Sequence, residues 1–135
     1  MANSTQYAKT VAASPSKIST TELHGRVRVA YADFTSAAAQ ETINMFKLPD
    51  GARIIGGRLN HAALGSSTTV SVGHAAYTQA DGTVVALDVD EYKAAASSAS
   101  ATGSAVASTT ALGENSLVDA PDGLIVTATT AGANA

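Results

Sequence analysis

The residues best suited to metal or acid–base chemistry are three histidines, His24, His61 and His74. We expect His61 and His74 to lie on adjacent strands, where their imidazoles could face each other. Two imidazoles without a nearby carboxylate make a poor metal site, because a bound metal needs a third ligand and hydrogen-bonded support for each histidine. Polar surface or cross-strand pairing is therefore the favoured interpretation, and no metal or other cofactor is expected.

A second candidate is the acidic cluster Asp88, Asp90 and Glu91 in the run DVDEY. Alternating carboxylates can begin a calcium loop, but the glycine and the distal glutamate of that loop are missing here. The same residues can cap a helix, because carboxylates favour the positive N-terminal end of the helix dipole. We therefore predict one short helix in the run 88–100 rather than an ion site.

The glycines and serines do not form a known catalytic motif. Gly51, Gly56 and Gly57 fit neither a phosphate-binding loop nor a dinucleotide-binding fingerprint, since the spacing differs and no Gly-Lys-Ser/Thr follows. A structural bend is the favoured role of the glycine pair. No serine lies in a G-x-S-x-G nucleophile elbow. We therefore assign no catalytic residue and predict that the chain is not an enzyme.

The arginines and tyrosines are candidates for binding rather than for catalysis. Four arginines are expected to place solvated charge at strand edges, with a salt bridge between subunits as the alternative; they are Arg26, Arg28, Arg53 and Arg58. A carbohydrate site usually needs exposed aromatic rings that stack on sugar faces. The chain has no tryptophan, and its four tyrosines are spread along the sequence: Tyr7, Tyr31, Tyr77 and Tyr92.

Composition narrows the class of partner. A net charge of -3, with 14% charged residues, argues against a nucleic-acid binder, which needs a basic stripe to neutralise phosphates. The absence of cysteine excludes disulfides and zinc–thiolate sites. No run approaches the roughly 20 apolar residues of a membrane span, so we expect no membrane association and synthesis in the cytoplasm. The 29 alanines, 14 serines and 16 threonines bury little area each, so we expect subunit contacts to add burial.

Alternating apolar residues and regularly spaced turns predict the elements that position these groups. We expect turns at 49–51, 81–82 and 121–123, where proline, aspartate and glycine supply turn conformations. The expected strands are 26–34, 41–48 with a bulge near Met45, 53–64, 68–77, 83–89, one around Val106, and 124–130.

About seven or eight short strands, with turns at intervals of roughly ten residues, are typical of antiparallel two-layer folds. The predicted fold class is all-β: an antiparallel, jelly-roll-like β-sandwich with one short helix. Residues 1–24 are predicted to form an extended N-terminal arm, because Pro15 and the polar runs around it disfavour a regular element. Residues 25–135 are predicted to form a single β-sandwich domain.

The run 25–73 carries a recognisable pattern of strand starts and turns. An alternating strand that ends in aromatic and aspartate residues is followed by an I-x-M-x-K-L-P-x-G-A-R-I type turn and a G-x-L-x-x-x-A-L-G strand start. The pattern resembles small structural proteins encoded near the major capsid protein in tailed bacteriophages. The matching residues are Val29–Phe34, Ile43–Ile54 and Gly57–Gly73, and Asp88–Tyr92 resembles the short helix that follows. Because these motifs are turns and strand starts, they mark a fold more than an activity.

The resemblance implies a virion structural protein, in the first place a capsid decoration (cement) protein that binds and stabilises the assembled head shell. Its implied partner is the major capsid protein, and its implied location is the capsid surface, after assembly in the host cytoplasm. We expect self-association, as a trimer, because closed symmetric contacts suit the three-fold sites of an icosahedral shell. The alternatives are a head–tail or tail structural component, or a carbohydrate-binding β-sandwich module.

Overall fold

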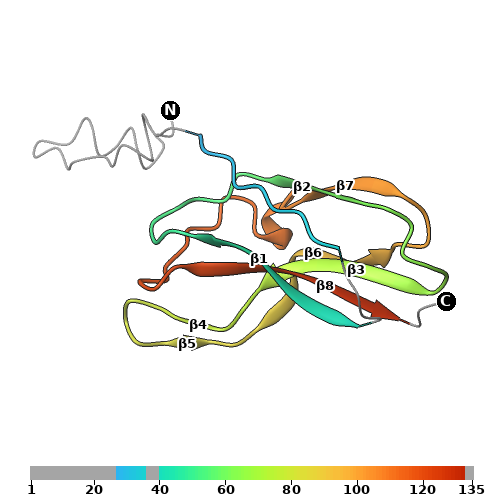
Figure 1. Cartoon of the computed structure of the whole chain (residues 1–135). Helices are drawn as coiled ribbons and strands as arrows, with labels where there is room; N and C mark the ends of the chain where they lie inside the picture. Colours follow the sequence, from blue (N-terminus) through green and yellow to red (C-terminus); the bar gives the residue numbers. More distant parts are fainter. Residues whose placement is uncertain (1–26, 36–39, 133–135) are drawn as a thin grey trace, which may run out of the picture.

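A computed structural model describes residues 27–35 and 40–132, and the statements below refer to these residues. This part is mostly β, with antiparallel sheets, no α-helix and one 3-10 turn (Figure 1). The predicted arm, 1–24, lies outside the described residues. The strands are β1 (Glu41–Leu48), β2 (Gly57–His61), β3 (Thr68–His74), β4 (Tyr77–Thr78), β5 (Val84–Val85), β6 (Asp88–Ser97), β7 (Thr102–Val106) and β8 (Leu124–Gly132), and the 3-10 turn η1 is Thr110–Leu112.

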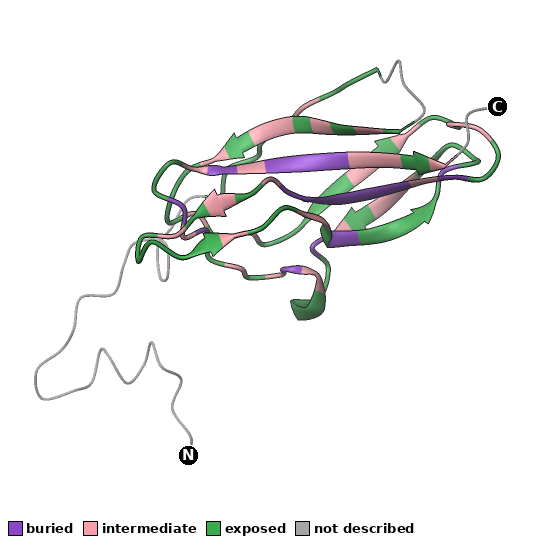
Figure 2. Ribbon diagram, turned by 90° about the horizontal axis from the view of Figure 1, so that it is seen from below, coloured by how far each residue is buried: buried purple, intermediate pink, exposed green. Residues whose placement is uncertain are grey.

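The strands pair as one long hairpin folded over on itself. β1 pairs with β8, β2 with β7, β3 with β6 and β4 with β5, and all four pairs are antiparallel. β8 also pairs with β3, which joins the outer and inner pairs into a four-stranded sheet of order β1-β8-β3-β6. Buried residues concentrate on the long strands of this sheet (Figure 2). The two central strands, β3 and β8, therefore hold the body together.

β2 and β7 form a separate two-stranded sheet, and β4 and β5 form another. Beyond the β2–β7 pair the ladder continues: the Gly51 N–H donates to the Val118 carbonyl, and the Val118 N–H donates to the Ala52 carbonyl, both at 2.8 Å. The Ala107 N–H donates to the Tyr92 carbonyl at 2.7 Å. This bond joins the residue after β7 to the middle of β6, so the β2–β7 sheet contacts the main sheet at Tyr92.

The core is made of mostly small and medium side chains. Its buried members are Val72, Tyr92, Ala107, Val118, Ala120, Leu124 and Val126, and half-buried residues such as Phe46, Leu59 and Val106 pack against them. Among the described residues, the largest side chains that are fully buried are those of Thr127 and Ser98. Alanine, serine, threonine and valine therefore supply much of the buried interior, and each of the smaller side chains buries little hydrocarbon.

Most predicted strands and turns are confirmed. The register between β1 and β8 slips between Asn44 and Phe46, which is the bulge expected near Met45. The turn centred on Asp81 and Gly82 joins β4 to β5, and Gly82 takes the positive φ of 88° that glycine tolerates. The predicted turns at 49–51 and 121–123 are also present, and β8 covers the strand predicted at 124–130.

The predicted short helix is wrong, because residues 88–97 form strand β6. Alanine-rich sequence favours a helix, but the propensity difference is well under about 1 kcal/mol per residue. In β6, Tyr92 and Lys93 are buried and the strand pairs with β3. Gly73 of β3 makes this contact possible, because a Cβ at that position would collide with the backbone of Asp88 and Val89. Tertiary packing outweighs local propensity here.

Other predicted strands are shortened, divided or unpaired. The strand predicted at 53–64 is reduced to β2, because Gly56 has a φ of 137° that interrupts the extended backbone. The strand predicted at 83–89 is divided between the short β5 and the start of β6. The strand predicted at 26–34 does not pair: its described part, from Val27 onwards, is extended without a strand partner among the described residues.

Candidate assembly surface

The described histidines do not come together. His61 lies on β2, and His74 lies on β3 in a different sheet, so the predicted pairing of the two imidazoles on adjacent strands is wrong. Each ring is held locally, with Nδ1 hydrogen-bonded to the carbonyl of the next residue, Ala62 or Ala75. No group of three or more histidine, cysteine, aspartate or glutamate side chains suited to a metal ion occurs among the described residues. His24 lies outside them.

Two of the tyrosines pack around His74 inside the body. The His74 ring lies 5.3 Å from the Tyr77 ring, edge to face, and 6.0 Å from the Tyr92 ring. Tyr92 is 5% exposed, and its burial raises the pKa of its phenol. Tyr31 is 83% exposed and lies apart on the extended segment. The described tyrosines therefore contribute to the core or stand singly, and Tyr7 lies outside the described residues.

The acidic cluster starts a strand rather than a helix. The Asp88 carboxylate accepts a hydrogen bond from the Asp90 N–H at 3.0 Å. This bond lowers the pKa of Asp88, and the nearby charge of His74, its partner on β3, acts in the same direction. The pKa of the Asp90 carboxyl is raised, chiefly by its hydrogen bond with the Asp88 side chain. The cluster is a local turn-like arrangement at the entry to β6.

The described arginines are exposed, as predicted for solvated charges. Arg53 donates from Nη1 to the Asn115 carbonyl at 2.7 Å, and Arg58 donates from Nε to the Asn60 side-chain oxygen at 2.8 Å. Both guanidinium groups thus bind neutral oxygens of the same chain. Arg28 lies on the exposed extended segment. Arg26 lies outside the described residues.

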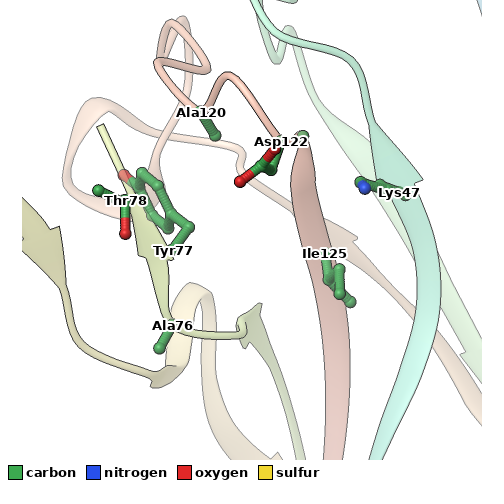
Figure 3. A pocket seen from close by; sticks show the side chains of 8 residues that line it. Lys47, Ala76, Tyr77, Thr78, Ala120, Asp122 and Ile125 are labelled. Atoms are coloured by element: carbon green, nitrogen blue, oxygen red, sulfur yellow. The ribbon is translucent and has the colours of Figure 1, made fainter. Parts of the chain in front are cut away.

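A shallow pocket of about 280 Å³ lies where β1, β4 and the start of β8 approach one another (Figure 3). Its charged groups are Lys47 of β1 and Asp122 of the turn before β8, and Tyr77 and Thr78 of β4 line the opposite side. Its arrangement offers an ammonium, a carboxylate and a phenol, which suits weak polar binding. Sequence reasoning missed this grouping, because the three segments are distant along the chain and carry no shared motif.

Exposed apolar side chains are the most conspicuous surface feature of the described chain. Eight large hydrophobic residues are more than half exposed: Val27, Val29, Tyr31, Phe34, Ile55, Val84, Leu87 and Leu117. Four of them fall on one segment of nine residues, 27–35, which we call the extended segment. Scattered apolar residues are ordinary on a protein surface, but a contiguous group marks a contact site.

Comparison with known proteins gives no match: no family model, no curated protein and no solved structure is similar to this chain. Within the described residues, no helix has the length and apolar character to cross a membrane.

Proposed function

We propose that this chain is a structural protein of a tailed-phage virion, a capsid decoration protein that binds the major capsid protein and stabilises the assembled head shell. The observation that carries this proposal is the extended segment, which presents Val27, Val29 and Tyr31 to solvent beside a body with a core of small residues. Contacts with neighbouring proteins would cover these side chains. The resemblance of the run 25–73 to small phage structural proteins supports the same function.

We further propose that the sheets form a jelly-roll-like β-sandwich, that residues 25–135 are one domain, and that residues 1–24 are an arm on it. The nested pairing of first with last strand, second with seventh, third with sixth and fourth with fifth supports this fold. A jelly roll is a long antiparallel hairpin rolled into two sheets, and eight strands is its usual number.

Stabilisation of the shell follows from preferential binding to the assembled state. A protein that binds assembled capsid subunits, and not separate ones, shifts the equilibrium toward assembly by mass action. A trimer placed at three-fold sites makes the same contact three times and closes on itself. Small, weakly charged subunits suit such repeated packing.

The experiment that tests the proposal heats purified head shells with and without the protein, and an unrelated protein of similar charge serves as the control. We expect the protein to sediment with the shells and to raise the temperature at which they rupture. Cryo-microscopy of the loaded shells is expected to show density repeated over the whole head. Absence of co-sedimentation, or an unchanged rupture temperature, contradicts the proposal. Density confined to one vertex would instead favour a head–tail component.

A further inference from the structure

The pocket beside Lys47 contains two opposite charges that do not pair. Lys47 of β1 and Asp122 of the turn before β8 both line it, yet neither side chain forms an ion pair or a hydrogen bond within the described part of the chain. Thr78 of β4 lines the same pocket, and its hydroxyl also has no hydrogen-bond partner there. An ammonium and a carboxylate that share a pocket without pairing are both available for charge-assisted hydrogen bonds to a ligand.

The aspartates near this pocket have a different role from Asp122. The Asp50 carboxylate accepts a hydrogen bond from the Ala120 N–H at 2.8 Å, and the Asp119 carboxylate accepts one from the Ala80 N–H at 3.2 Å. These two bonds hold the loop that carries Asp122 against its neighbours. Asp122 accepts no such bond among the described residues, so it is the carboxylate of this loop that remains for a ligand.

The Lys47 side chain is directed toward Asp122 because Gly123 leaves room for it. Lys47 lies opposite Ile125 in the β1–β8 pair, so the two side chains share one face of the sheet. A Cβ at Gly123 would come within 2.6 Å of Lys47 Cε, which shows that the lysine stem crosses the glycine next to Asp122. In Figure 3 the Lys47 amino group points toward β8, and the Asp122 carboxylate points toward Tyr77. The two charges therefore lie on adjoining parts of one wall.

The opposite wall is tied to the same sheet and is more apolar. The Ala75 N–H donates to the Ile125 carbonyl at 2.9 Å, which holds the chain before β4 against β8. The Tyr77 ring packs edge to face against the His74 ring at 5.3 Å. Ala76, Tyr77 and Ile125 then line the pocket with apolar surface. A site whose walls are fixed in this way loses little freedom when a ligand binds.

Charge and size together select the class of ligand. Lys47 donates to a carboxylate and Asp122 accepts from an ammonium group, so a molecule that carries both groups satisfies both side chains at once. An anion alone would meet the Asp122 carboxylate, and a neutral sugar would leave both charges without a counter-ion. The volume of about 280 Å³ holds about nine waters at roughly 30 Å³ each, which suits a free amino acid.

We infer that this pocket binds a free α-amino acid with an apolar side chain, whose carboxylate contacts Lys47 and whose ammonium group contacts Asp122. Both protein side chains are exposed, so solvent weakens each contact. The expected dissociation constant is therefore about 1–10 mM. The inference does not use the proposed function, and it is tested on the isolated protein. A chain that stabilises shells but binds no amino acid would separate the two proposals.

The test titrates L-leucine into the isotope-labelled protein and follows the amide resonances of the lining residues by nuclear magnetic resonance. Two analogues that each lack one charge are titrated in parallel: leucinamide lacks the carboxylate, and N-acetyl-leucine lacks the ammonium group. We expect leucine to bind about fivefold more tightly than either analogue. Equal affinity for all three, or no shift of the lining resonances at about ten times the expected dissociation constant, overturns the inference.

Two variants assign each charge of the ligand to its residue. Lys47→Gln should remove the preference for leucine over leucinamide and keep the preference over N-acetyl-leucine. Asp122→Ser should have the converse effect. The matched controls are Arg58→Gln and Glu91→Gln, which remove exposed charges outside the pocket and should change neither preference. The amide spectrum of each variant reports whether it is folded.

The neutral sugar is the competing ligand. Glucose titrated under the same conditions is expected to shift the lining resonances little. If glucose binds as tightly as leucine, or if Lys47→Gln and Asp122→Ser both keep the two preferences of the wild type, the assignment to an amino acid is overturned.

Discussion

At the scale of single residues, the buried hydroxyl groups of the main sheet differ in how well they are satisfied. Thr127 of β8 is fully buried, and its Oγ1 has no hydrogen-bond partner among the described residues. Thr68 of β3 is also buried, but its hydroxyl donates to the Gly65 carbonyl at 2.7 Å and accepts from Ser98 Oγ at 2.9 Å. Burial of an unpaired polar group costs about 1–3 kcal/mol.

We predict that Thr127→Val stabilises the protein by about 1 kcal/mol, because it replaces an unsatisfied hydroxyl with a methyl group of similar shape. Thr68→Val is the matched control and should destabilise by about 1–3 kcal/mol, because it leaves Ser98 without an acceptor. Urea unfolding of both variants measures whether the free energy of unfolding rises or falls in each. Destabilisation by Thr127→Val would show that its hydroxyl has a partner in solution.

The carboxyl pair at the start of β6 gives a prediction for pH. The folded-state pKa of Asp88 is lowered, so this group contributes stability above its ordinary pKa of 3.8, and that contribution is lost as the pH falls through the folded value. The folded-state pKa of Asp90 is raised, so the contribution of Asp90 to stability has the opposite sign. Asp88→Asn should therefore cost stability at pH 6 and cost less near pH 3.

Asp90→Asn is the control for this pair, since removal of the group with the raised pKa should not reduce stability at pH 6. Urea unfolding of wild type and both variants across this range measures the effect. Parallel pH profiles for wild type and Asp88→Asn would contradict the assignment.

At the scale of elements, the contact between β3 and β6 depends on a glycine. A Cβ at Gly73 would collide with the backbone of β6 at Asp88 and Val89, and backbone cannot rotate away as a side chain can. We predict that Gly73→Ala destabilises by about 1–3 kcal/mol. Gly57→Ala is the control, because its Cβ would meet only the Val106 side chain at an ordinary 3.6 Å. Equal urea midpoints for the two variants would contradict this account.

The sequence predicted strands well where alternation and turn chemistry agree. β1 with its bulge, the Asp81–Gly82 turn and β8 all have a local cause that can be read from residue types. β6 could not be predicted in this way, because its alanines favour a helix and its strand conformation comes from the backbone of β3 packed against it. The segment at 27–35 shows the converse, since a strand pattern needs a partner before it becomes a strand.

The candidate contact surface was only partly predictable. Alternation identified Val27, Val29 and Tyr31 as one apolar face, but nothing local indicated that this face would be exposed. The expected pairing of His61 with His74 failed, because their positions depend on which strands become neighbours. The pocket beside Lys47 could not be predicted for the same reason, since three segments that are distant along the chain form it. Strand order is a property of the whole chain.

At the scale of the whole molecule, the proposed self-association links stability to concentration. A contact present only between folded copies raises the free energy of unfolding as the protein becomes more concentrated. We predict that the thermal midpoint of the wild type rises with protein concentration, and that Val29→Ser reduces this rise, because it removes an exposed apolar side chain that a neighbouring copy would cover.

Val29 is 89% exposed, so the substitution should leave the midpoint at low concentration nearly unchanged. Val84→Ser in β5 is the exposed-valine control and should keep the concentration dependence, because Val84 lies outside the extended segment. Calorimetry over a wide concentration range measures all three. A midpoint independent of concentration in the wild type contradicts the prediction.

The position of β8 has a consequence for biosynthesis. β8 is the last described strand in the chain, yet it lies between β1 and β3 at the centre of the main sheet. Until β8 has been synthesised, β1 has no neighbour in that sheet, and the apolar sides of β1 and β3 stay uncovered. Such non-local pairing closes slowly. The main sheet can therefore close only once β8 has left the ribosome, and chaperones are expected to bind the uncovered apolar sides until then.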